Sequence, residues 1–242
     1  MPPSLSPARL IEAGEIGARL HPLDRAVAVL RLADAASVDP AQLPIAARDR
    51  QLAQLRHALF GDPMPCLVDC PVCAAPLEFD LSASDVAAAL ADPQPETLYQ
   101  EGWEIMLRPL DSHDLAAAVR AVDLAASADM LLRRAVASVS GPRGETTFDA
   151  LPAPVALAVE ARVAEREGAG EIMLDLNCEG CGKGWTTTFD IGLYLWAEID
   201  TARRRLIAEI ATLAARFGWS EADLLAMTPE RRHAYLHAEA IA

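Results

Sequence analysis

The sequence is nearly devoid of lysine. It has 242 residues, of which 21 are Lys or Arg, and Lys183 is the one lysine among them. A P-loop needs a lysine after a glycine-rich turn, and no such motif is present. A Gly-x-Ser-x-Gly nucleophile elbow is also missing. The usual P-loop phosphate site is therefore excluded, and Lys183 is a poor Schiff-base candidate.

Positive charge and long apolar runs are scarce too. The net charge is −14, which argues against a general nucleic-acid binder because such proteins need a basic surface. No window approaches eighteen uninterrupted apolar residues, and residues 1–20 lack the apolar core of a secretory signal. With 52% hydrophobic residues, we expect a globular cytoplasmic protein without a membrane span. Cytoplasmic conditions favour thiolates or bound metal over disulfides.

The sequence does contain two Cys-x-x-Cys pairs. Cys70 and Cys73 precede a Leu-Glu-Phe-Asp stretch, and Cys178 and Cys181 precede a second Phe-Asp stretch. Residues 171–177, before the second pair, alternate between apolar and polar as a strand does. Two thiolates on a glycine-rich turn suit one half of a zinc knuckle, and two such halves make a zinc ribbon.

The spacing of the pairs is unusual for a ribbon. Residues 74–177 separate them, 104 in all, where a compact ribbon has about 15–20. We therefore expect a ribbon split by an insertion, with one Zn²⁺ held by all four cysteines. Two disulfides, two unrelated pairs and a decayed site without metal are the alternatives. Cys66 is left over, and a buried or free thiol describes it better than a fifth ligand.

Four thiolates saturate tetrahedral zinc, whereas catalytic zinc keeps a position open for water or substrate. The predicted site is accordingly structural. It is a strong signal for metal and is nearly silent on function, because ribbons serve many roles.

The remaining pattern is mostly helical. Proline at first-turn positions, Ser, Thr or Asp caps and Gly stops delimit the segments. We expect a strand at 103–107, one or two insertion strands that join the ribbon's sheet, and an amphipathic helix of about 25 residues within 191–220. The other expected helices are 21–34, 46–61, 82–93, 111–139 (long or broken), 151–170, 220–227 and 228–240.

Two other groups of polar residues were weighed as catalytic sites. His233 and His237 have the spacing of metalloprotease ligands, but Ala234 stands where such a site needs its Glu base. Two solvent-facing histidines describe them better. Asp111, His113 and Asp114 cluster at a helix start, where capping explains them better than acid–base catalysis. We therefore expect no enzymatic activity.

The basic run 203–205 has two interpretations. The favoured one is a solvated helix face paired with Glu198, Asp200 and Glu209, and the other is a patch that docks a protein. Trp196, Trp219 and Tyr235 could anchor an interface, but their apolar neighbours favour core packing.

Most of the chain resembles a known family. The C-terminal text FDIGLYLWAEID and RFGWSEADLLAMTPERRHAYL, together with both cysteine pairs and HPLDRAVAVL, is similar to T4-type phage baseplate hub assembly chaperones of contractile tail and injection-system gene clusters. The resemblance implies an assembly or structural role with a baseplate or hub protein as partner, and possible incorporation into the particle.

The sequence thus predicts an α+β, mainly α fold with a small four-Cys zinc ribbon split by a largely helical insertion. Its expected parts are helical 1–62, ribbon half 63–81, insertion 82–170, ribbon half 171–191 and helical 192–242. The expected function is a non-enzymatic, zinc-stapled protein-binding factor. A zinc-ribbon adaptor in transcription or RNA-related complexes is the alternative, which the charge disfavours. The sequence does not specify an oligomeric state.

Overall fold

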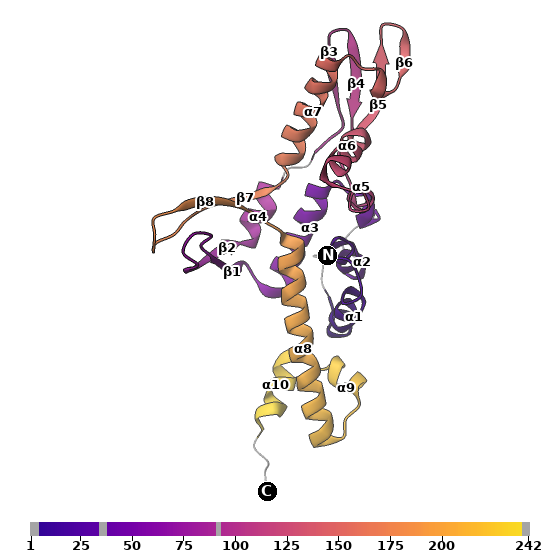
Figure 1. The fold of residues 1–242 in the computed structure, drawn as a ribbon. Coiled ribbons are helices and arrows are strands. Elements are labelled where there is room, and N and C mark those ends of the chain that lie inside the picture. Colours follow the sequence, from indigo (N-terminus) through magenta and orange to yellow (C-terminus); the bar gives the residue numbers. More distant parts are fainter. Residues whose placement is uncertain (1–4, 34–37, 91–92, 239–242) are drawn as a thin grey trace.

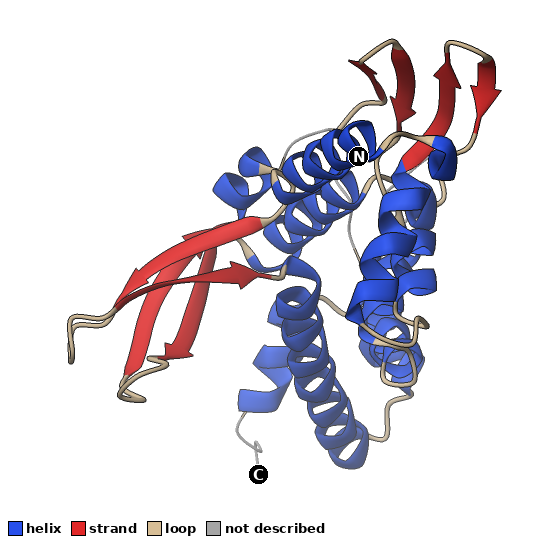
Figure 2. Cartoon of the chain, turned by 45° about the horizontal axis from the view of Figure 1, so that its top comes forward, coloured by secondary structure: helices blue, strands red, loops and turns tan. Residues whose placement is uncertain are grey.

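The long helix α8 (Ile191–Phe217) is the element against which the other parts are arranged (Figure 1). The structure is a computed structural model that describes residues 5–33, 38–90 and 93–238. In this part of the chain, helices predominate and the strands form three small antiparallel sheets (Figure 2). The predicted class, α+β and mainly α with helical terminal segments, is confirmed.

Helices surround α8 along its length. The N-terminal ones pack near its first half, and two short ones pack on its last turns. Their bounds are α1 (Pro7–Gly17), α2 (Pro22–Leu32), the 3-10 turn η1 (Pro40–Gln42), α3 (Ile45–Phe60), α9 (Glu221–Ala226) and α10 (Pro229–His237).

Two β-hairpins project together from one side of this helical body (Figures 1 and 2). The first is β1 (Pro63–Asp69) with β2 (Pro76–Ser82), and the second is β7 (Ile172–Asn177) with β8 (Gly184–Phe189). Helix α4 (Ala83–Ala89) follows the first hairpin, and α8 follows the second directly. Strand β1 was not predicted, because Pro63 and Pro65 gave its segment the appearance of a loop.

The insertion between the hairpins differs from the prediction in its sheet. Its four strands pair with one another in the order β3-β4-β5-β6, and none joins a ribbon hairpin. The predicted strand 103–107 is confirmed as β4. The bounds are β3 (Glu96–Gln100), β4 (Trp103–Leu107), α5 (Ser112–Ala118), α6 (Leu124–Ala135), β5 (Val136–Gly141), β6 (Gly144–Thr146), η2 (Phe148–Ala150) and α7 (Ala153–Gly168).

The predicted helix 111–139 is broken, and its last residues are not helical. Helix α5 ends at Ala118, and α6 begins after Asp123, whose carboxylate caps it. Val136 and Val139 then pair with β4, because strand β5 offers branched side chains a place on the insertion's own core.

The ends of the other predicted helices agree with the sequence signals that predicted them. Pro22 lies at the first turn of α2, while Gly61 (φ 87°) and Gly218 (φ 70°) take the left-handed backbone after α3 and α8. Predicted helical residues 34, 91–92 and 239–240 lie outside the described residues.

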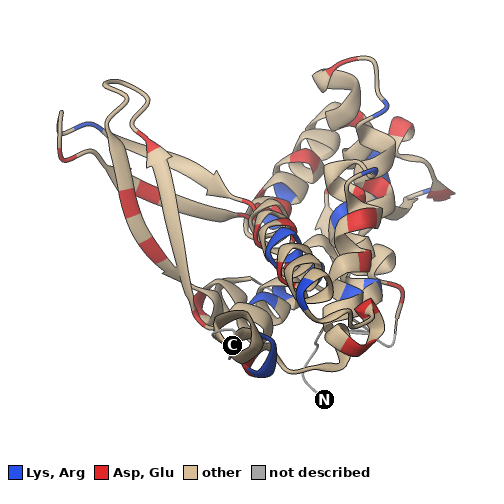
Figure 3. Cartoon of the chain, turned by 90° about the horizontal axis from the view of Figure 1, so that it is seen from below, with Lys and Arg blue, Asp and Glu red and all other residues tan. Residues whose placement is uncertain are grey.

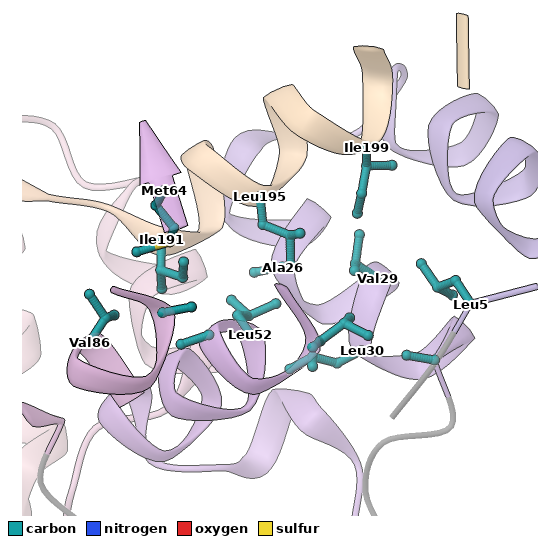
Figure 4. Packing of buried hydrophobic residues seen from close by; sticks show 14 of the residues in the cluster. Leu5, Ala26, Val29, Leu30, Leu52, Met64, Val86, Ile191, Leu195 and Ile199 are labelled. Carbon is teal, nitrogen blue, oxygen red and sulfur yellow. The ribbon is translucent and has the colours of Figure 1, made fainter. Parts of the chain in front are cut away.

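The largest core joins the helical body to the bases of both hairpins (Figure 4). Leu52 and Leu55 of α3 meet Ile191, Leu195 and Ile199 of α8 there, and each is at most 1% exposed. Met64 of β1 and Val86 of α4 belong to the same core. The core therefore fixes where each hairpin leaves the body.

Two smaller cores serve the ends of the molecule. One lies between the insertion's sheet and α7, around Ile105, Leu107 and Val159. The other lies between α8 and the two last helices, around Leu213 and Leu224. Separate cores explain why the insertion does not share a sheet with the hairpins: its strands bury their apolar face against α7.

Helix α1 lies in the segment 1–62 that was expected to be helical, but no separate helix was predicted for it. Its buried side consists of Ala13, Gly14 and Gly17, so an apolar stripe was not there to reveal it. The glycines let α1 lie against α8: a Cβ at Gly14 would overlap Arg203, and one at Gly17 would overlap the Trp196 ring. Close backbone approach, rather than large side chains, makes this contact.

Replacing Gly17 by Ala should destabilise the protein by about 1–3 kcal/mol, because the new methyl group has to displace the Trp196 ring. Gly168→Ala is the matched control, since a Cβ at Gly168 meets nothing within 4 Å. The control should leave the free energy of unfolding unchanged or raise it by up to about 1 kcal/mol. Urea unfolding measures both, and equal effects of the two variants would refute the close contact.

Candidate metal centre

An ion pair and a hydrogen bond set the positions of the two hairpins at their bases. Arg56 of α3, 2% exposed, donates to both carboxylate oxygens of Glu198 in α8, at 2.9 and 2.8 Å. The same guanidinium donates to the Gly61 carbonyl, 2.7 Å away, in the turn before β1. Tyr194 of α8 donates to the Pro65 carbonyl at 2.9 Å. The helix after the second hairpin is thus bonded directly to the start of the first.

The tips of the hairpins repeat one backbone pattern. The Cys70 N–H donates to the Ala75 carbonyl and the Cys178 N–H to the Lys183 carbonyl, both at 2.9 Å. The N–H of Ala74 donates to the Cys70 carbonyl, and the N–H of Gly182 donates to the Cys178 carbonyl in the same way. These are two copies of one knuckle, and each turns its backbone so that both of its thiols face the other hairpin.

The four predicted cysteines meet between the tips. The Sγ atoms of Cys70 and Cys181 are 3.7 Å apart, those of Cys73 and Cys178 are 3.6 Å apart, and all four lie within 4.8 Å of one another. Sulfurs on a tetrahedral zinc, with Zn–S about 2.3 Å, are about 3.8 Å apart. A disulfide needs about 2.05 Å, and all five cysteines are free. The cluster therefore has the donor set and spacing of a metal site.

The thiols influence one another's protonation. Backbone N–H groups of Cys73 and Val72 lower the pKa of Cys70 to about 6. The Ala75 N–H lowers the pKa of Cys73, but the neighbouring thiols, Cys178 first, raise it more, to about 12. One thiolate forms easily and its charge opposes the next. A cation at the centre would remove this repulsion.

Alternate residues form a half-buried row on each hairpin strand. In the second hairpin the row includes Leu174, Leu176 and Trp185, and their neighbours in sequence are exposed. Cys66 lies on the corresponding row of β1, and its thiol donates to the Met64 carbonyl at 3.4 Å. Burial raises the pKa of this thiol. Cys66 is not part of the four-sulfur cluster.

The polar groups at the start of α5 and on α10, which the sequence also offered as catalytic candidates, do not form a comparable site. Asp111 caps α5, and Asp114 completes the capping box while pairing with Arg108 at 2.8 Å. His233 and His237 are exposed on α10, with ring centroids 4.2 Å apart. Within the described residues, the four cysteines form the one cluster of three or more metal-ligating side chains.

The basic run divides into one packed and two exposed arginines. Arg203 lies over Gly14 and pairs with Asp200 at 2.7 Å, whereas the Arg204 side chain is 72% exposed. Arg205 is exposed and has no ion-pair partner in the described part of the chain. Neither Glu198 nor Glu209 pairs with the run, because Arg56 and Arg232 hold them.

Trp196, Trp219 and Tyr235 are half-buried and pack against apolar cores. Trp196 packs on the largest core and lies under the Arg25 guanidinium, 4.9 Å from it. Trp219 and Tyr235 belong to the C-terminal core, with ring centroids 4.8 Å apart. Core packing therefore accounts for all three.

Comparisons with protein-family models, with curated proteins and with solved structures gave no match. None of the described helices is long and apolar enough to cross a membrane.

One of the equivalent positions at which the two knuckles differ allows a reciprocal test. Ala74 (φ 55°) and Gly182 (φ 71°) both have left-handed backbone, and a Cβ at Gly182 would meet no atom within 4 Å. Gly182→Ala should therefore cost about 1 kcal/mol of stability through backbone conformation alone, and Ala74→Gly should gain about 0.5–1 kcal/mol. Urea unfolding of the protein as purified measures both. Changes of the same sign would contradict the shared knuckle geometry.

Proposed function

We propose that this chain is a non-enzymatic protein-binding factor whose cysteines Cys70, Cys73, Cys178 and Cys181 hold one structural Zn²⁺. The observation that carries the metal assignment is the convergence of four free thiols at tetrahedral spacing. Four thiolates leave zinc no open position for water or substrate, so the ion would stabilise geometry rather than perform chemistry. Its binding energy would contribute to folding.

The zinc would join two chain segments at a distance from the main core. The hairpins are held at their bases by α3 and α8, and the ion would hold them at their tips. The insertion starts from the first hairpin, through α4, and returns into the second. Clamping both hairpins would therefore also limit how the insertion moves relative to the helical body.

The proposed partner is a baseplate or hub component of a contractile injection apparatus, as the sequence resemblance implies. A groove of about 900 Å³ beside α8 supports a docking role. Leu10, Phe60 and Leu206 contribute apolar surface to it. Arg205, which has no ion-pair partner among the residues that the structure describes, lines it too. An amphipathic helix with an acidic residue at its edge fits this combination.

The charge distribution disfavours the adaptor alternative. Figure 3 shows acidic residues on both hairpins, where Lys183 is the one basic residue of segments 63–82 and 172–189. Zinc hairpins that contact nucleic acid need the opposite charge, because phosphate contacts depend on Lys and Arg. An adaptor of this kind would have to bind protein alone.

Protein purified without chelator should contain about one equivalent of zinc, measured by elemental analysis. Cys178→Ser should lose the metal and lower the melting temperature together, since three ligands no longer saturate the ion. Cys66→Ser is the matched control and should retain both metal and melting temperature. A metal-free protein that is fully folded would overturn the zinc assignment, as would equal losses in the two variants.

The partner proposal predicts that a tagged chain, expressed with its whole gene cluster, co-purifies a tail component. Reversing charge at Arg204 and Arg205, both to Glu, should slow that association about tenfold and reduce its salt dependence. Arg143→Glu, in the turn between β5 and β6, is a single charge reversal away from the groove and should have no effect. Surface plasmon resonance with the captured component measures the rates.

Deletion of the gene should lower the yield of intact sheathed particles, counted by electron microscopy. Particles at normal yield, with no tail component in the pull-down, would refute the assembly role. Recovery of RNA polymerase or ribosomal proteins instead would favour the adaptor.

A further inference from the structure

Two exposed histidine rings lie side by side on α10, the last helix that the structure describes. The ring centroids of His233 and His237 are 4.2 Å apart, and the ring planes are inclined at 59°. Residues four apart on a helix are neighbours on the same face. Neither ring has a hydrogen-bond or ion-pair partner among residues 5–33, 38–90 and 93–238, so the ring nitrogens can accept a ligand.

The distance between the rings suits two ligands of one metal ion. An imidazole nitrogen binds a dication such as Zn²⁺ at about 2.0–2.1 Å, which places the ring centroid about 3.2 Å from the ion. Two such rings at right angles around one ion therefore have centroids about 4.5 Å apart. The observed 4.2 Å needs only small side-chain rotations, which exposed side chains make readily.

The helix that carries the pair is anchored on α8, beside which it lies in Figure 1. Arg232 of α10, 4% exposed, reaches Glu209 of α8 at 3.4 Å. Arg216 of α8 donates to the Tyr235 and Leu236 carbonyls at the end of α10, at 3.4 and 3.5 Å. Because the helix is held on both sides of the pair, little backbone freedom remains to be lost when both rings bind one ion.

The charged groups around α10 indicate which kind of cation fits. Arg216 lies at the end of the helix, and Arg231 lies over the Tyr235 ring, 5.8 Å from its centroid. Glu230, three residues before His233, is a carboxylate on the same face. One carboxylate near two arginines is a poor site for Mg²⁺ or Ca²⁺, which need several oxygen ligands. Neutral imidazole nitrogens instead suit Ni²⁺, Cu²⁺ and Zn²⁺.

We propose that His233 and His237 form an open chelating site for one divalent transition-metal ion that prefers imidazole. The two rings supply two ligands, and water molecules fill the remaining positions. The site is chelating rather than catalytic, because Ala234 stands where a metalloprotease has its glutamate base. It is separate from the four-cysteine cluster, and the inference is independent of the proposed zinc and partner.

The test is isothermal titration of the full chain as purified with Ni²⁺, Co²⁺ and Mg²⁺, slightly above neutral pH, where free imidazole is unprotonated. The expected binding of Ni²⁺ at the pair has a stoichiometry of one and is tighter than that of Co²⁺, following the Irving–Williams order. Mg²⁺ should give no measurable heat. Comparable binding of Mg²⁺ would assign the heat to the acidic surface and overturn the proposal.

His233→Gln and His237→Gln should each weaken this Ni²⁺ binding at least tenfold, because a two-point chelate becomes a single ligand. His113→Gln removes another exposed histidine, at the start of α5, and should leave the affinity unchanged. All five cysteines are present in the three variants, so nickel bound by thiols is common to them. An unchanged affinity in either α10 variant, or an equal loss in His113→Gln, would refute chelation by the pair.

Discussion

The structure depends on the packing of α3 against α8. The first hairpin begins three residues after α3 ends, and α8 begins directly after the second hairpin. Any shift between the two helices would therefore be carried to the hairpin tips, where the sulfurs have to meet within a few ångströms. Leucine and isoleucine packing supplies most of the contact energy, and the Arg56–Glu198 pair fixes the register. A buried guanidinium with one carboxylate partner tolerates little sliding, because loss of that partner leaves an uncompensated charge.

Local signals in the sequence were sufficient for the helices that bury large side chains. Proline, cap residues and stop glycines located α2, α3, α7 and α8, and the paired cysteine text located the four-cysteine cluster. They failed where burial used small residues or where the strand signal was masked. Helix α1 packs through Gly14 and Gly17, and β1 contains two prolines, so neither had the expected periodicity. The separate sheet of the insertion was not predictable either, because strand partners are chosen by a distant apolar face, that of α7.

The candidate site was also predictable only in part. The identity of the four sulfur donors followed from spacing and chemistry, since two Cys-x-x-Cys pairs with similar text after them suit one shared tetrahedral site. What supports those donors did not follow. Arg56, Glu198 and Tyr194 carry no motif, and their roles depend on contacts across more than a hundred residues of sequence.

The split ribbon also has a consequence for the order of events on the ribosome. Cys70 and Cys73 emerge more than a hundred residues before Cys178, and at about 5–20 residues per second the delay is about 5–20 s. Glu198, the carboxylate partner of Arg56, is synthesised later still, because it lies beyond the second hairpin. During that interval the N-terminal half lacks three of its core residues, Ile191, Leu195 and Ile199. It also carries three free thiols, those of Cys66, Cys70 and Cys73. The insertion, with a core of its own, can fold in this time. The packing of the N-terminal helices can therefore be completed only after α8 has been synthesised.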